Sequence, residues 1–456
     1  MKLGYQSIKN LSVRTGIPIP QLLALARQND PFFAGAPASQ DMAEWFGRLW
    51  RTFHYDTGVH LRRVHYQIVS TGTRRADGSP YENTQTCWDY LCMAAKSARY
   101  LGLVAVDSFV DRRNPDPHVH IYPRWSAAAP SAEVQLAEWT LPAIQTDLAT
   151  GVQIDIPDPD IYGYDYEAVD QPYHLEVWAE KSTMDDVLVP VCRELGANLV
   201  TSLGFQSITS VIQLLQRIAQ SRKSARIFYI SDYDPAGDSM PVAVARQLEY
   251  WAQDFAPDQE VKLQPLALTV SQVEEYRLPT IPVKESDKRR ANFEARYGQQ
   301  GAVELDALEA LYPGSLGQIV RNALRDYVDQ SLMERLENAG YEARAVARRQ
   351  WADRVGDLRL DAGDLSDRVR AIADTYRSRL EALAAELGEE LAIYHEELEN
   401  LRTAVENEID SFEADLPERP EADIQPPDED EWLLDTNRQY MEQLEIYQTR
   451  KSGVNV

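Results

Sequence analysis

RIFYISDYDPAG, residues 226–237, joins an apolar run to a sharp turn that carries two aspartates. The run from Ile227 to Ile230 is apolar without alternation, which is typical of a strand buried on both faces of a parallel sheet. Pro235 and Gly237 then favour a tight turn into a helix. The stretch therefore predicts a buried strand, a turn bearing acids, and a helix.

The flanking sequence repeats this alternation of strand and helix. We predict further strands at 175–179, 198–203 and 261–268, with amphipathic helices between them. A βαβαβαβ order predicts an open parallel sheet with helices on both faces over residues 173–268.

The N-terminal region has a different pattern. Helical periodicity covers much of residues 1–101, including a strong helix at 83–101, and short strands are predicted at 103–106 (LVAV) and 118–122 (HVHIY). Helices followed by a strand pair are typical of a winged helix-turn-helix, here residues 1–125. A connector at 126–172 with little regular structure and a helical region at 269–350 associated with the sheet domain complete this part of the chain.

The C-terminal region predicts one long helix and a tail. Apolar residues recur about every 3.6 positions from Leu365 to Phe412, so we expect a helix over 364–412 with a continuous apolar stripe. An uncovered stripe predicts pairing with a second copy or a partner helix, hence a homodimer. The alternative is that the helix folds back onto residues 270–350. Residues 415–456 are expected to form an acidic tail that ends in a short helix, and its Pro-rich part, residues 415–431, is expected to be flexible.

Composition limits the possible functions. The 456 residues carry a net charge of -26, which excludes a uniformly basic nucleic-acid-coating protein and a polybasic membrane binder. Residues 1–125 hold 15 Lys and Arg against 10 Asp and Glu, so this region alone can face DNA. Three cysteines without a CxxC motif, no signal peptide and no apolar run long enough to span a bilayer predict a cytoplasmic, nucleoid-associated protein without a membrane partner.

Acidic residues follow two of the predicted strands. Glu180 ends one strand, and Asp232 and Asp234 end another. Parallel strands bring their carboxyl ends to one edge, where converging carboxylates require a cation such as Mg²⁺ or Mn²⁺. The alternative is that the aspartates only cap the helix that follows them.

These motifs together resemble a Toprim domain. The marks are Glu180-Lys181 after one strand, Gly204-x-x-Ser207 opening a helix after the next, and DxDPxG after the third. Toprim is the metal-binding α/β fold of topoisomerases, primases and some nucleases, and the DPxG form most resembles the A subunit of type IIB topoisomerases (topoisomerase VI) and the related meiotic transesterases. The resemblance implies metal ligation by Glu180, Asp232 and Asp234. It also implies a phosphate contact by Lys181, for which the alternative is a solvated surface lysine.

A second resemblance concerns the N-terminal region. Type IIB enzymes place a nucleophilic tyrosine in a winged helix within a pattern like R-x-x-Y-Y, and RRVHY (62–66) is similar, with His65 replacing the first tyrosine. This implies that Tyr66 is the nucleophile, assisted by Arg63 or His65. The alternative is that Tyr66 is only a half-buried residue of its helix. We expect DNA phosphates to be contacted by Arg62, Arg63, Lys96, Arg99 and Lys181.

The sequence leaves three functions open. The first two are Mg²⁺-dependent phosphodiester cleavage by tyrosyl transesterification and by hydrolysis with metal-activated water. The third is a non-catalytic DNA-binding or assembly subunit with a Toprim shape. Neither GxGxxG nor GxxxxGK[ST] is present, so ATP-driven strand passage would need a separate ATPase subunit. The chain also resembles a group of bacterial and phage proteins that join a winged helix to a Toprim-like domain, through HYQIVSTG, EVWAEKSTM, SDYDPAGDSM and VELDAL (303–308).

Overall fold

The structure, a computed structural model, describes residues 4–110, 114–121, 129–141, 154–202, 204–285, 287–298, 301–376 and 384–452. The chain forms two compact units. Unit 1 contains residues 1–124, 168–329 and 423–456, and unit 2 contains residues 125–167 and 330–422. No helix among the described residues combines the length and the apolar character needed to cross a membrane.

A mostly parallel β-sheet forms the centre of unit 1, as expected for the predicted α/β fold. Its strand order is β4-β3-β5-β6-β7, in which β3 to β6 are parallel and β7 is antiparallel. The strands are β3 (His174–Ala179), β4 (Asn198–Thr201), β5 (Ala225–Ile230), β6 (Val261–Ala267) and β7 (Leu434–Asp435).

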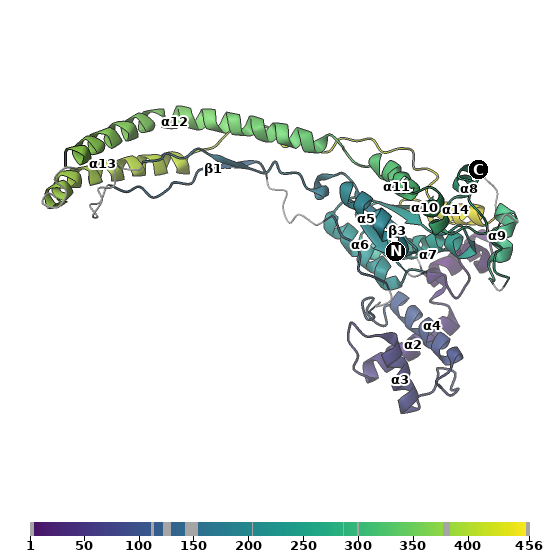
Figure 1. The fold of residues 1–456 in the computed structure, drawn as a ribbon. Helices are drawn as coiled ribbons and strands as arrows, with labels where there is room; N and C mark the ends of the chain where they lie inside the picture. Colours follow the sequence, from purple (N-terminus) through teal and green to yellow (C-terminus); the bar gives the residue numbers. More distant parts are fainter. Residues whose placement is uncertain are drawn as a thin grey trace. The chain divides into compact units, whose positions relative to one another are not determined.

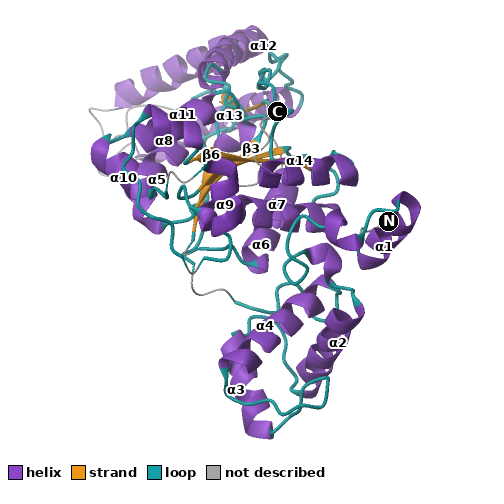
Figure 2. Cartoon of the chain, turned by 90° about the vertical axis from the view of Figure 1, so that its right-hand side faces the viewer, coloured by secondary structure: helices purple, strands orange, loops and turns teal. Residues whose placement is uncertain are grey.

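Helices cover both faces of this sheet (Figure 2). Ile227 and Tyr229 of β5 pack in the core beneath α6 and α7, whereas Phe228 and Ile230 pack in the core beneath α5 and α11. This alternation follows from the two-residue period of a strand. The helices of this part are α5 (Asp185–Glu194), α6 (Ile208–Ser221), α7 (Pro235–Phe255), α8 (Val270–Glu275), α9 (Arg290–Tyr297), α10 (Leu305–Leu311) and α11 (Ser315–Arg325).

The N-terminal part of unit 1 is helical. Helices α2 (Pro37–Thr52), α3 (Leu61–Thr71) and α4 (Gln85–Tyr100) share an apolar core, and α1 (Tyr5–Thr15) packs on the sheet domain. Thr84 caps α4 by accepting from the Cys87 amide. At the C-terminal end of α4, the Tyr250 hydroxyl donates to the Tyr100 carbonyl and joins the helical group to α7.

The predicted wing strands are wrong within the described residues. Residues 103–106 are turn and loop, and residues 118–121 form no hairpin with them. Instead, His118 pairs with Leu199 of β4 through two backbone hydrogen bonds of 2.8 and 2.9 Å. Because β4 is the edge strand, its free backbone groups need partners, and this segment supplies them.

Unit 2 is built around a helical hairpin. Helix α12 (Leu332–Tyr376) and helix α13 (Ala384–Asp410) pack side by side (Figure 1). Arg354 pairs with Glu408 at 3.0 Å and Arg368 with Glu397 at 2.9 Å, so the two helices run antiparallel. The short strands β1 (Ser131–Glu133) and β2 (Asp160–Tyr162) pair antiparallel within the predicted connector.

The single helix predicted over 364–412 is therefore wrong, as is the boundary at residue 350. Helix α12 begins at Leu332, and its apolar face is covered by α13 and by the segment around Trp139. Val369 and Val405, which lie on the predicted stripe, are both fully buried. Since the chain covers its own stripe, the observation behind the predicted homodimer or partner helix does not hold. Leu380 and Leu383 of that stripe lie outside the described residues.

The acidic tail is also not a free segment. Residues 423–456 belong to unit 1 and contribute β7 and α14 (Tyr440–Ser452). Glu429 is 7% exposed and pairs with Arg226 and with Lys262, the latter at 2.7 Å. The predicted terminal helix is confirmed. The flexibility predicted for residues 415–431 does not hold at Glu429, which Arg226 and Lys262 attach to the sheet.

Candidate functional site

The carboxyl ends of β3 and β5 meet at one edge of the sheet. Ala179 and Ile230 are paired in register, and the Glu180 amide donates to the Ile230 carbonyl at 2.9 Å. Glu180 Oε2 in turn accepts from the Asp232 amide at 3.1 Å. The register of two parallel strands thus places the predicted glutamate directly beside the first predicted aspartate.

Asp232 is buried and has two partners. Its Oδ1 accepts from the Leu305 amide at 2.8 Å, and its Oδ2 lies 2.8 Å from Lys181 Nζ. Lys181 Nζ also lies 3.3 Å from both Glu304 and Asp306. Lys181 is therefore not a solvated surface lysine, since its ammonium group is held among three carboxylates.

Asp234 serves as the N-cap of α7. Its Oδ1 accepts from the Gly237 amide at 2.6 Å, so the capping alternative applies to Asp234 but not to Asp232. Gly237 allows the turn to close, because a Cβ atom there would lie 2.0 Å from the Asp232 carbonyl oxygen. The DxDPxG motif thus folds the strand end tightly against the first turn of α7.

Burial and charge strongly perturb these groups. Burial, followed by the charges of Asp232 and Asp234, raises the pKa of Glu180 to about 7. Burial also raises the pKa of Asp232, although the hydrogen bond from Lys181 opposes this. For Lys181, burial lowers the pKa, but the carboxylates around it more than compensate and raise it above its usual value. The acids therefore lie close enough to oppose one another's ionisation.

The three predicted metal ligands differ in whether their carboxylate oxygens are already engaged by other residues. Within the described part of the chain, no three His, Cys, Asp or Glu side chains are arranged as ligands of one metal ion. Asp232 is engaged by Lys181 and Leu305. Glu180 Oε1 and Asp234 Oδ2, in contrast, accept no hydrogen bond from the described residues. Two open carboxylates fit Mg²⁺, which commonly takes one or two protein carboxylates and keeps several waters.

Glu176, the other acid of β3, has a structural role. It is fully buried and accepts two hydrogen bonds of 2.9 Å from Arg217. It also accepts from Trp178 at 2.9 Å and from Asn198 at 3.0 Å. Burial alone would raise the pKa of Glu176, but Arg217 and the hydrogen bonds hold it well below its usual value. All its acceptor capacity is used, as expected for a buried charge.

The residues of the predicted tyrosine site all lie on α3, and the centres of the His65 and Tyr66 rings are 5.2 Å apart. Tyr66 on α3 is 58% exposed, whereas His65 is buried, with Nδ1 2.7 Å from the Tyr81 hydroxyl and Nε2 3.1 Å from the Asn83 side-chain oxygen. Both ring nitrogens are thus occupied, so His65 has no free nitrogen for the Tyr66 hydroxyl. Arg62 and Arg63 lie over Trp88 and Tyr55, at 6.0 and 5.9 Å from the ring centres.

The two predicted phosphate contacts of α4 face the rest of unit 1. Lys96 Nζ donates to the Gln28 carbonyl at 2.6 Å, and burial lowers its pKa. The Arg99 guanidinium lies over Phe109, 4.9 Å from the ring centre. Both line a pocket inside unit 1, so this face of α4 is not the open groove-binding surface of a recognition helix.

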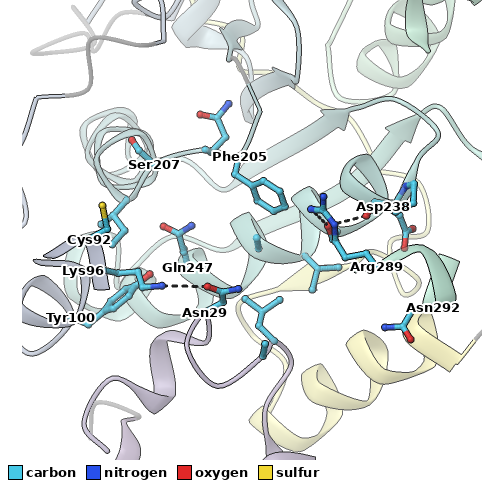
Figure 3. Close-up of a pocket in the computed structure, with 18 of the residues that line it drawn as sticks. Asn29, Cys92, Lys96, Tyr100, Phe205, Ser207, Asp238, Gln247, Arg289 and Asn292 are labelled. Carbon is cyan, nitrogen blue, oxygen red and sulfur yellow. Dashed lines mark hydrogen bonds between the residues drawn. The ribbon is translucent and has the colours of Figure 1, made fainter. Parts of the chain in front are cut away.

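That pocket has a volume of about 790 Å³ and was not predicted from the sequence. Figure 3 shows Lys96 and Asn29 on one side, Arg289 and Asp238 on the other, and the Phe205 ring between them. Pro235, Asp238 and Ser239 from the first turn of α7 border it, so the pocket adjoins the acidic edge. The negative charges of Asp234 and Glu180 also contribute to a raised pKa of Arg289, after its hydrogen bond to Asp287.

Fold and site together define an α/β protein with carboxylates and a lysine gathered at the carboxyl edge of a parallel sheet. No protein-family model and no curated protein matches the chain.

Proposed function

We propose that the chain is a Mg²⁺-dependent DNA-processing enzyme that cleaves phosphodiester bonds in an active site formed by Glu180, Asp232 and Asp234. The supporting observation is that two adjacent parallel strands end in carboxylates, with Glu180 Oε2 3.1 Å from the Asp232 amide and Lys181 Nζ 2.8 Å from Asp232. Ligands of α/β proteins bind beyond this end of the strands. The similarity of the motifs to Toprim domains agrees with this location.

The residues divide into three roles. Glu180 and Asp234 would hold the metal through their open oxygens, and Asp232 positions Lys181. Lys181, already beside the carboxylates, would contact a phosphate of the substrate. A bound Mg²⁺ would supply charge stabilisation to the phosphoryl group and lower the pKa of a bound water.

The contacts favour hydrolysis over transesterification. In hydrolysis, a water oxygen bonds to phosphorus, the bond to the leaving sugar oxygen breaks, and the proton lost by the water is balanced by one gained at the leaving oxygen. For transesterification Tyr66 would need a base, and His65 is engaged by Tyr81 and Asn83. Tyr66 remains a second candidate nucleophile because its side chain is 58% exposed and accessible to a strand.

DNA is the proposed substrate on the basis of charge. The N-terminal region carries a positive excess in a chain with a net charge of -26. Binding through phosphate contacts should weaken as salt rises, with a log–log slope of about -0.9 for each contact on a duplex. A separate ATPase subunit belongs to this proposal only if strand passage accompanies cleavage.

The experiment is a nicking assay on supercoiled plasmid DNA with the full chain and Mg²⁺ or Mn²⁺. Glu180→Gln and Asp234→Asn should abolish metal-dependent nicking, whereas Glu275→Gln, an exposed carboxylate of the same unit, should not. Denaturing the reaction before electrophoresis separates the mechanisms. A protein–DNA adduct that disappears in Tyr66→Phe would establish transesterification. DNA binding without nicking under any metal would overturn the enzymatic proposal in favour of a non-catalytic subunit.

A further inference from the structure

The pocket of unit 1 concentrates positive charge in an acidic chain. Five of the described residues that line it are basic, and Asp238 is the one carboxylate among them. Asp238 holds Arg296 at 3.0 Å and Arg450 at 3.4 Å, so one negative charge serves two guanidinium groups. Lys96 donates to the oxygens of Gln28 and Asn29, both neutral. Arg289 is also paired with a carboxylate, that of Asp287, at 2.9 Å. Five cationic side chains against these two carboxylates leave the local charge positive, which favours an anionic ligand.

Several buried hydrogen-bonding groups of the pocket have no partner among the described residues. Gln206 is 6% exposed, and both its side-chain oxygen and nitrogen are buried without a hydrogen bond to any residue that the structure describes. The same applies to Gln247 Oε1 and to Arg450 Nε. Buried polar groups in folded proteins are almost always satisfied, so this cluster indicates a polar ligand. A primary amide offers one acceptor and two donors side by side, which matches the edge of a nucleobase.

An exposed aromatic ring provides a stacking surface. Phe205 is 48% exposed, and Figure 3 shows its ring pointing into the middle of the pocket. The Arg289 guanidinium lies 5.5 Å from the centre of this ring. A ring beside a guanidinium is a common platform for a planar base that carries a phosphate.

We propose that this pocket binds a nucleotide, with the base stacked on Phe205 and hydrogen-bonded to Gln206, and the phosphate beside Arg289 and Arg450. The volume of about 790 Å³ lies in the range of small-molecule sites and accommodates one nucleotide. The ligand is either a free nucleotide or the phosphorylated end of a strand, since both present a base and a phosphate.

This proposal does not require the acidic edge to be catalytic. The pocket residues that it uses are distinct from Glu180, Asp232 and Asp234. Nucleotide binding without nicking would therefore support the pocket and count against the proposed function, whereas nicking without nucleotide binding would do the reverse.

The experiment titrates the full chain with AMP, ATP, inorganic phosphate and a short single-stranded oligonucleotide with or without a 5′-phosphate. We expect AMP or ATP to bind, and Phe205→Ala to weaken that binding at least tenfold. Phe205→Ala should leave the weaker binding of inorganic phosphate unchanged, because only the base contacts the ring. Arg289→Gln should weaken both ligands.

Two controls make the result decisive. Tyr312→Ala removes another exposed aromatic ring of unit 1 and should not affect binding. Glu275→Gln, at an exposed carboxylate of the same unit, should bind as tightly as the unaltered protein. Binding of only the 5′-phosphorylated oligonucleotide, lost in Phe205→Ala, would assign the site to a strand end. Equal binding by the unaltered, Phe205→Ala and Arg289→Gln proteins, or no binding of any nucleotide, would overturn the proposal.

Discussion

The ionisation of Glu180 should make the free energy of unfolding of unit 1 depend on pH, and the substitution Glu180→Gln should remove this dependence. Burial and the charges of Asp232 and Asp234 raise its pKa from the ordinary value of 4.5 to about 7. One pKa unit corresponds to about 1.4 kcal/mol, so the rise from 4.5 to about 7 gives an upper limit of about 3.5 kcal/mol. Because the carboxyl is partly exposed, solvent screening reduces this to about 1–2 kcal/mol.

The direction follows from proton linkage. A carboxyl whose pKa is raised in the folded state keeps its proton after the unfolded chain has lost it. Its contribution to stability is therefore complete below pH 4.5 and is lost as the pH rises through about 7. Glutamine carries no charge at any pH and its side-chain oxygen can still accept from the Asp232 amide. Glu180→Gln should thus gain about 1–2 kcal/mol relative to the unaltered protein between about pH 5 and about pH 8.

Chemical denaturation followed by tryptophan fluorescence at the two pH values measures this difference. Glu275→Gln, on an exposed carboxyl, controls for the loss of one negative charge. Adding Mg²⁺ at the higher pH should stabilise the unaltered protein by about 1.4 kcal/mol at ten times its dissociation constant and should not stabilise Glu180→Gln. A stability difference between the two proteins that stays constant with pH would refute the reasoning about burial and like charge.

Two further predictions concern residues that stabilise unit 1, and both are measured by chemical denaturation. Gly237→Ala should destabilise unit 1 by about 2 kcal/mol, since its Cβ would lie 2.0 Å from the Asp232 carbonyl oxygen. Gly356→Ala in α12 has open space and should instead be neutral or stabilise by up to about 1 kcal/mol. Glu429→Gln should cost about 3 kcal/mol near neutral pH, because it leaves Arg226 without its buried partner. Burial alone would raise the pKa of Glu429, but the effect of its basic partners is larger, and its pKa in the folded protein is lowered. The cost of the substitution should therefore shrink as the pH falls below 4.5. If Glu429→Gln left the stability unchanged, the docking of the tail on unit 1 would be contradicted.

The sheet and its acidic edge could be predicted because their signals are local. An unbroken apolar run such as Ile227–Ile230 identifies a buried strand, and a proline and a glycine mark the turn that follows. Once β3 and β5 are parallel neighbours, Glu180 and Asp232 necessarily lie at the same edge. The partner of Asp232 could not be predicted in this way, because the Leu305 amide lies in a loop far along the chain.

The helical hairpin shows where periodicity is insufficient. An apolar stripe over 364–412 identifies a face that must be buried, but it does not identify what covers it. The missing signal was the earlier start of the same helix at Leu332, since a helix this long can supply the antiparallel partner itself.

The acidic tail also carried a signal in its sequence. Trp432, Leu433 and Leu434 form an apolar run within it, and all three are buried in unit 1. That run was the available sign that the tail folds onto the sheet domain.

The pocket was not predictable because its parts come from distant segments that only the tertiary fold unites. Arg246 of α7 is fully buried and connects them. It lies 3.1 Å from Asp30 and 2.8 Å from Glu249, and it donates to the Tyr440 hydroxyl at 2.6 Å. Because an unpaired buried guanidinium is costly, this cluster holds the N-terminal loop and α14 against α7 together. The same arrangement brings Arg450 of α14 to Asp238, at the side of α7 that borders the pocket. Segments at the two ends of the sequence are thus part of the proposed nucleotide site, and residues 173–268 alone would lack its cationic side.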